Sequence, residues 1–154
     1  MKKMGVKNEF LSPCGMYCSV CSVRAADENN DQKLKESLAS FFGTSPANIA
    51  CDGCMSERTF QFAKICPIRA CAQKKELKGC CQCDDFPCNN IQNFPIESAK
   101  NRILKSVPRW KEIGTERWVA EQEKHYTCSD CGTLLHRYAN KCSKCDRAFV
   151  VYGE

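Results

Sequence analysis

YTCSDCGTLLHRYANKCSKCDRAFVVY, residues 126–152, decides the fold of the C-terminal part of this chain. It contains two C-x-x-C pairs, Cys128 with Cys131 and Cys142 with Cys145, separated by ten residues. In a zinc knuckle, such a pair lies on a tight turn that places both sulfurs on one metal ion. Two knuckles complete a tetrahedron of four thiolates, so the spacing predicts a zinc ribbon.

The residues beside the two pairs favour short β-strands, with Tyr126 entering, residues 133–135 leaving and residues 149–152 returning. Gly132 supplies a flexible position after the first pair. A zinc ion with four thiolate ligands has no coordination position for a substrate, which predicts a structural site. His136 lies between the pairs, but four cysteines already saturate the metal, so we expect a surface or packing histidine.

The cysteine content points to metal ligands throughout the chain. Fifteen of the 154 residues are cysteine, and the N-terminal lysines are not followed by the apolar segment of a secretory signal. No run of residues approaches the length of an apolar membrane span. We therefore expect a cytoplasmic protein with no membrane partner. In a reducing compartment, closely spaced cysteines are metal ligands more often than disulfides.

The formal net charge of +5 is weak evidence for a nucleic-acid partner. That value counts every cysteine as neutral, whereas a zinc ion bound by four thiolates contributes −2. Three such sites would bring the net charge to −1. Within the ribbon, the charged side chains nearly balance, with one net positive charge from Arg137, Lys141, Lys144 and Arg147 against Asp130, Asp146 and Glu154.

The other eleven cysteines lie between residues 14 and 88 and include three further C-x-x-C pairs. Ten of them are candidate metal ligands: Cys14, Cys18, Cys21, Cys51, Cys54, Cys66, Cys71, Cys80, Cys83 and Cys88. Cys81 is extra. Ten thiolates do not divide into four-ligand sites. Either two single zinc ions bind and two thiols remain free, or six thiolates share two zinc ions beside one four-cysteine site. The chain is thus expected to hold three or four zinc ions, and an iron–sulfur cluster is an alternative for the N-terminal part.

Four motifs in this region, SPCGMYCSVC, CDGC, CPIRAC and CCQCDDFPC, occur in this order between residues 12 and 90. Together they resemble a family of functionally uncharacterised, cysteine-rich bacterial and archaeal proteins. The resemblance implies metal binding by the ten cysteines named above, while Cys81 departs from the family pattern. It implies no particular activity, and the ribbon lies outside it.

Helical patterns occupy most of the remaining chain. Apolar residues at helical spacing, Leu34, Leu38, Phe41 and Phe42, predict a helix that Asn30 or Asp31 caps and Gly43 ends. Pro67 and Pro87 are each expected to begin a short helix. Arg69 is expected to pair with Asp84 or Asp85, or to donate to a thiolate.

The stretch between the two cysteine-rich regions also favours helices. Pro95 predicts the start of one helix, whose apolar stripe runs to Pro108, and a second helix is expected from about Arg109. This second helix carries Trp110 and Trp118, which are expected to pack against the cysteine-rich part.

These patterns predict three parts: a metal-stapled, mostly α and irregular domain over residues 1–92, a helical linker over 93–125, and a small β zinc ribbon over 126–154. The chain has neither a catalytic triad nor a phosphate-binding loop, which favours a role other than catalysis. The leading hypothesis is a zinc-binding adaptor with structural zinc sites and a protein partner. The alternatives are an iron–sulfur or thiol-redox protein, and nucleic-acid binding through the ribbon.

Overall fold

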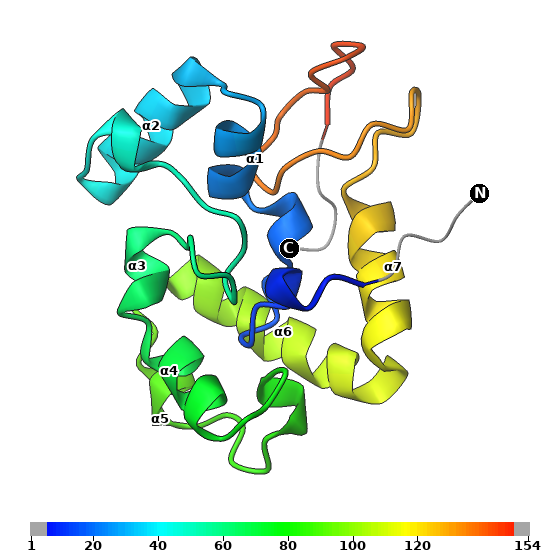
Figure 1. Ribbon diagram of the computed structural model, residues 1–154. Coiled ribbons are helices and arrows are strands. Elements are labelled where there is room, and N and C mark those ends of the chain that lie inside the picture. Colours follow the sequence, from blue (N-terminus) through cyan, green and yellow to red (C-terminus); the bar gives the residue numbers. More distant parts are fainter. Residues whose placement is uncertain (1–5, 150–154) are drawn as a thin grey trace.

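The computed structural model describes residues 6–149 and is mostly helical, with irregular segments between the helices (Figure 1). The helices are α1 (Ser22–Glu28), α2 (Gln32–Phe42), α3 (Gln61–Lys64), α4 (Pro67–Lys74), α5 (Asn89–Gln92), α6 (Glu97–Ile113) and α7 (Thr115–His125). Short 3₁₀ turns lie at η1 (Asn8–Phe10), η2 (Cys18–Val20), η3 (Pro46–Asn48) and η4 (Cys80–Gln82). Within the described residues, no helix combines the length and the apolar character needed to cross a bilayer.

The first cysteine motif forms the centre of the molecule. Residues 11–15 are all buried, as are Tyr17, Cys18 and Val20. Figure 1 shows this blue segment in the middle, with α1 and α2 on one side, α3 to α5 on another, and α6 and α7 beside it. Both cysteines of this segment, Cys14 and Cys18, are buried.

The two tryptophans join α6 and α7 to this centre. The rings of Trp110 and Trp118 are stacked, with centroids 4.5 Å apart, and the ring of Tyr17 meets Trp118 edge-on at 5.8 Å. Both tryptophans are almost fully buried, at 1% and 0% exposure. The Nε1–H group of Trp118 donates to Ser106, whose hydroxyl donates to the carbonyl of Gly15. The expected packing of the tryptophans against the cysteine-rich part is confirmed.

The boundary between α6 and α7 differs from the prediction. A single helix runs through Pro108 and ends at Ile113, so the predicted break at Arg109 is wrong. Proline removes one backbone hydrogen bond, but buried residues on both sides of it, Val107 and Trp110, hold the helix on the core. The break falls at Gly114 instead, where φ is +82°, a conformation that favours glycine.

The shorter helices confirm most of the predicted boundaries. Asp31 caps α2 by accepting from the N–H of Leu34, and Gly43 ends the helix in the left-handed conformation. Pro67 is the first residue of α4, as expected. Pro87 and Pro95 are not helical starts, because α5 and α6 each begin two residues later, at Asn89 and Glu97. At these positions Cys88 and Ile96 take the extended N-cap conformation, which keeps both prolines outside the helices.

The C-terminal part forms less β-structure than the sequence predicts. Within residues 126–149 the antiparallel pairing consists of two isolated bridges, Thr127 with Leu134 and Lys141 with Ala148. Around the cysteines, many backbone N–H and C=O groups form the hydrogen bonds of tight turns. They are therefore not available for longer strand pairing, and each hairpin has one bridge. The predicted returning strand over residues 149–152 lies outside the described residues, apart from Phe149.

Candidate metal centre

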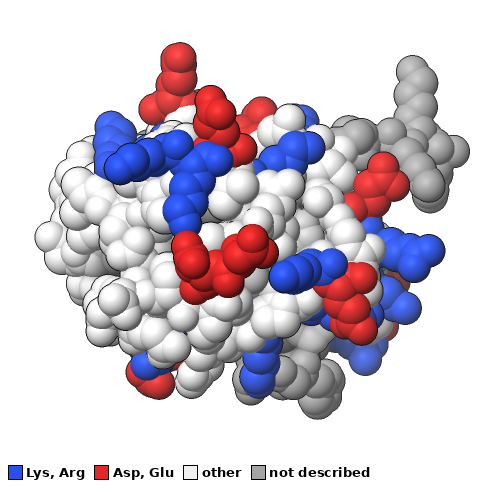
Figure 2. Space-filling model, turned by 90° about the horizontal axis from the view of Figure 1, so that it is seen from below, with Lys and Arg blue, Asp and Glu red and all other residues white. Residues whose placement is uncertain are grey.

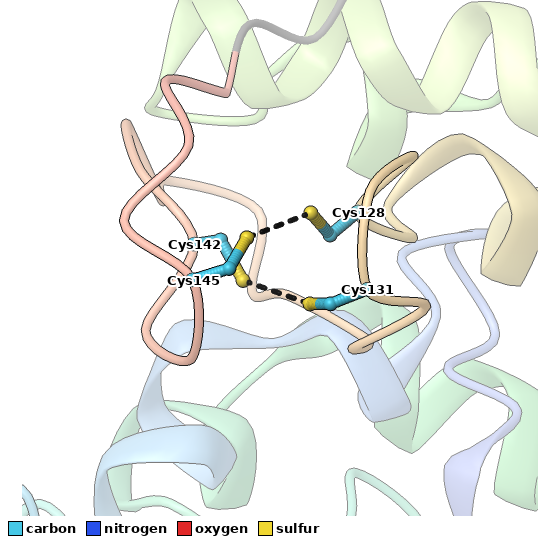
Figure 3. A group of neighbouring side chains, drawn as sticks. All are labelled: Cys128, Cys131, Cys142 and Cys145. Carbon is cyan, nitrogen blue, oxygen red and sulfur yellow. Dashed lines mark hydrogen bonds between the residues drawn. The ribbon is translucent and has the colours of Figure 1, made fainter.

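Four cysteine sulfurs converge at the C-terminal end of the structure (Figure 3). The sulfur of Cys128 lies 3.6 Å from that of Cys145, and the sulfur of Cys131 lies 3.5 Å from that of Cys142. All four lie within 4.8 Å of one another, and within the described chain this is the only group of three or more metal-ligating atoms at such spacing. The group could hold a metal ion.

The two C-x-x-C turns that supply these sulfurs share one backbone pattern. The N–H of Cys128 donates to the carbonyl of Thr133, five residues on, and that of Cys142 donates to the carbonyl of Arg147. In each turn, the residue four positions after the first cysteine donates back to the carbonyl of that cysteine. That residue has a positive φ in both turns, +75° at Gly132 and +59° at Asp146. The sequence revealed the first of these positions through its glycine, but not the second.

Hydrogen bonds to sulfur lower the pKa of two of the four cysteines, whereas contacts with the neighbouring sulfurs raise the pKa of Cys145 to about 12. The hydroxyl of Thr133 lies 3.1 Å from the sulfur of Cys131. This hydroxyl and the backbone N–H of Thr133 both form hydrogen bonds with the sulfur, and together they lower the pKa of Cys131 to about 6. Backbone N–H groups of Cys145 and Lys144 lower the pKa of Cys142. Because metals bind thiolates, groups that stabilise the thiolate also favour the bound metal.

The loop between the two turns docks onto the centre of the molecule. The N–H of Arg137 donates to the carbonyl of Val20 at 2.7 Å, and its buried guanidinium donates to the carbonyl of Tyr17. The Nδ1 atom of His136 lies 3.0 Å from the hydroxyl of Ser22. His136 is therefore a packing residue, as expected. Arg137 was counted in the sequence only as a surface charge, and its burial is a new observation.

Three of the four basic side chains in this part already have partners. Arg137 is buried as described above, Arg147 pairs with Asp130, and Lys141 lies 3.6 Å from Asp146. The pair formed by Arg147 and Asp130 also joins the second turn to the first. These contacts leave little basic surface in this part for binding phosphate groups.

The N-terminal cysteines are gathered less tightly. Around η2, the N–H of Cys54 donates to the sulfur of Cys18 at 3.3 Å. Burial raises the pKa of Cys18, and the nearby thiols of Cys21, Cys54 and Cys51 raise it further. The N–H of Gly53 lies 3.4 Å from the sulfur of Cys51, the same contact that Lys144 makes with Cys142. Four cysteines thus surround η2, and the local turn at Cys51 resembles a knuckle.

Arg69 and Asp27 hold the loop that carries Cys51 and Cys54. The guanidinium of Arg69 donates to the carbonyl of Cys54 at 2.6 Å and not to Asp84 or Asp85, so that part of the prediction is wrong. Burial raises the pKa of the Cys54 thiol, whereas the charge of Arg69 lowers it, and this agrees with the predicted interaction with a thiolate. Helix α4 begins only after Cys66, and its first turn aims Arg69 at this loop. The carboxylate of Asp27 accepts from the N–H of Cys51 and from Arg58.

Cys14 and Cys66 lie between this group and the remaining cysteines. Both belong to an apolar cluster that includes Ile68, Ile91 and Ile103. Burial raises the pKa of Cys14, whose sulfur lies 3.1 Å from the hydroxyl of Ser12. Their role as ligands stays a prediction.

The last four candidate ligands, Cys71, Cys80, Cys83 and Cys88, line one pocket of about 310 Å³. They come from α4, from the turn η4 and from the N-cap of α5. Lys75 stands at this pocket, with its ammonium 3.5 Å from the sulfur of Cys83 and 3.0 Å from Asp85. The sequence did not single out Lys75, although it follows Cys71 by one helical turn.

Comparison with known proteins gives one match. A family model described as a protein of unknown function (DUF3795) matches residues 10–93, more than half of the chain. The matched stretch contains all eleven N-terminal cysteines, and Cys128, Cys131, Cys142 and Cys145 lie outside it. A search of curated proteins and a search of solved structures found no match.

Proposed function

The chain belongs to the DUF3795 family of proteins of unknown function, and on that premise we propose that it is a zinc-stapled binding protein. In this proposal Cys128, Cys131, Cys142 and Cys145 bind one structural zinc ion. The ion fixes two knuckles of a ribbon, and the ribbon is fixed in turn on the helical core. The protein then presents a rigid surface to a protein partner.

The observation that carries the proposal is the spacing of the four sulfurs. A tetrahedral zinc ion with bonds of about 2.3 Å holds its sulfurs about 3.8 Å apart. Two of the distances between these sulfurs, 3.6 and 3.5 Å, lie close to that value. Four protein ligands also leave no open coordination position, which supports a structural role over a catalytic one.

Removal of zinc by a chelator is expected to unfold the ribbon. Within the described residues, its own apolar cluster contains three buried residues, Cys128, Leu135 and Cys142, two of which are proposed ligands. Structural zinc supplies about 10–16 kcal/mol of apparent binding free energy in zinc-finger peptides, far more than so small a core. Hydrogen exchange over residues 126–149 should therefore lose its protection after chelation and regain it when zinc is added. Unchanged protection after zinc loss would contradict the proposal.

A protein partner fits the surface better than a nucleic acid does. On the face seen in Figure 2, basic and acidic side chains are interspersed, with a broad uncharged area beside them. Nucleic-acid binding requires several free basic side chains, and most of those in the ribbon are already paired or buried. Elsewhere, Phe41 at the end of α2 is 68% exposed, and Phe62 in α3 is 41% exposed. Exposed aromatic side chains are typical of surfaces that bind proteins.

We expect the exposed aromatic residues to contribute little to folding, which leaves them available for a partner. Replacing Phe41 with serine should change the free energy of unfolding by less than about 0.5 kcal/mol. The matched control is Phe60, which is 8% exposed and packs against Phe42, and its replacement by alanine should cost about 3 kcal/mol. Urea unfolding measures both. Equal losses for the two variants would assign Phe41 to the core instead.

A further inference from the structure

We propose that Cys71, Cys80, Cys83 and Cys88 are the ligands of an iron–sulfur cluster bound in the pocket between α4, η4 and α5. This centre is separate from the zinc site of the ribbon. The proposal rests on the shape of the pocket, on the spacing of its sulfurs and on the charge beside it.

The pocket brings together four cysteines that are spread over eighteen residues of sequence. Helix α4 supplies Cys71, the turn η4 has Cys80 at its start and Cys83 at its end, and Cys88 is the N-cap of α5. Four cysteine thiolates are the usual ligand set of an iron–sulfur cluster. Helix α4 packs on α5, and both α5 and η4 pack on α6.

The spacing distinguishes this group from the ribbon. The four sulfurs of Cys128, Cys131, Cys142 and Cys145 lie within 4.8 Å of one another, and within residues 6–149 no three of the pocket sulfurs meet that condition. The four cysteine residues line a cavity of about 310 Å³, roughly ten times the volume of one water molecule in the liquid. A cluster of several iron and sulfide ions holds its ligands further apart than one zinc ion does. The pocket therefore fits a cluster better than a single ion.

The surroundings of the pocket suit an anionic cluster. Its walls include apolar side chains from Ile68, Ala72, Leu77 and Phe86, which restrict the access of water. The ammonium of Lys75 donates to the sulfur of Cys83, and Asp85 orients it from the other side. Positive charge and hydrogen bonds at the ligand sulfurs stabilise the reduced state of such a cluster and raise its reduction potential.

The test is reconstitution of the full-length chain with ferrous iron and sulfide in the absence of oxygen. We expect absorption near ~400 nm and equal amounts of bound iron and sulfide. Replacing Cys71 or Cys83 with serine should abolish both. Cys81 is the matched control, because it adjoins Cys80 in sequence but lines a different pocket, and Cys81→Ser should keep the cluster. Failure of the wild-type chain to bind iron and sulfide, or an equal loss in Cys81→Ser, would overturn the proposal.

A second variant separates cluster binding from folding. Lys75→Met keeps all four ligands, so its iron content should match that of the wild-type chain, while its reduction potential should move to a more negative value. An unchanged reduction potential in Lys75→Met would show that Lys75 does not act on the cluster. Zinc content is measured in the same samples. We expect Cys83→Ser to keep the zinc ion of the ribbon, which would show that the two centres bind their metals independently. If the pocket bound zinc and no iron, the proposal of an iron–sulfur cluster would be wrong, while the proposal of a zinc site in the ribbon would stand.

Discussion

Replacing Cys142 with serine is expected to remove one zinc ion from the chain and to unfold residues 126–149. The side chain of Cys142 is fully buried, and its sulfur lies 3.5 Å from that of Cys131. Loss of one of four ligands opens the coordination shell and lowers the affinity for zinc. Without the ion, the small apolar cluster around Cys128, Leu135 and Cys142 cannot offset the conformational entropy of ordering these residues.

Elemental analysis and hydrogen exchange measure the two parts of this result. Ser143→Ala is the matched control, since Ser143 is an exposed neighbour in the same turn and supplies no ligand. The Ser143→Ala variant should keep its zinc ion and its protection from hydrogen exchange over residues 126–149. If Cys142→Ser retained zinc at the level of the wild-type chain, the four-cysteine site would be wrong.

The second large effect is expected at the stacked tryptophans. Trp118 is fully buried between Trp110 and Tyr17, and its ring links α7 to α6 through Ser106. Replacing it with alanine should lower the free energy of unfolding by about 3–5 kcal/mol, the range for removing a large aromatic side chain from a core. Because whole domains are stable by only about 5–15 kcal/mol, this loss is expected to leave the chain near its unfolding limit.

Urea unfolding followed by circular dichroism checks this result. Trp118→Phe keeps an aromatic ring but loses the hydrogen bond to Ser106, so it should cost clearly less than the alanine variant. Arg117→Ala changes an exposed neighbour and should cost less than about 0.5 kcal/mol. A loss below about 1 kcal/mol for Trp118→Ala would show that α7 does not depend on the tryptophan pair.

The sequence predicted those features that local chemistry fixes. The two C-x-x-C pairs located the four-cysteine group, and the apolar spacing with Asp31 and Gly43 gave both ends of α2. Membership of an uncharacterised cysteine-rich family, inferred from four ordered motifs, is confirmed by the match over residues 10–93. In each case, the signal lies within a few neighbouring residues or within a fixed order of motifs.

The features that were missed depend on contacts between distant parts of the chain. Pro108 is tolerated inside α6 because the core holds the helix on both sides of it. Arg137 is buried because the ribbon loop docks on residues 17 and 20, more than a hundred positions away. The pocket around Cys71 depends on how α4 and α5 pack, which no local pattern contains. The division of the chain into three parts and the role of the other six N-terminal cysteines stay predictions.

X-ray absorption at the zinc edge tests the central claim most directly. The full-length chain, purified without oxygen, should contain zinc surrounded by four sulfur atoms at about 2.3 Å, with no nitrogen or oxygen ligand. That result would assign the ribbon a closed, structural ion held by Cys128, Cys131, Cys142 and Cys145. A chain without zinc, or zinc with a nitrogen or oxygen ligand in its first shell, would contradict the account.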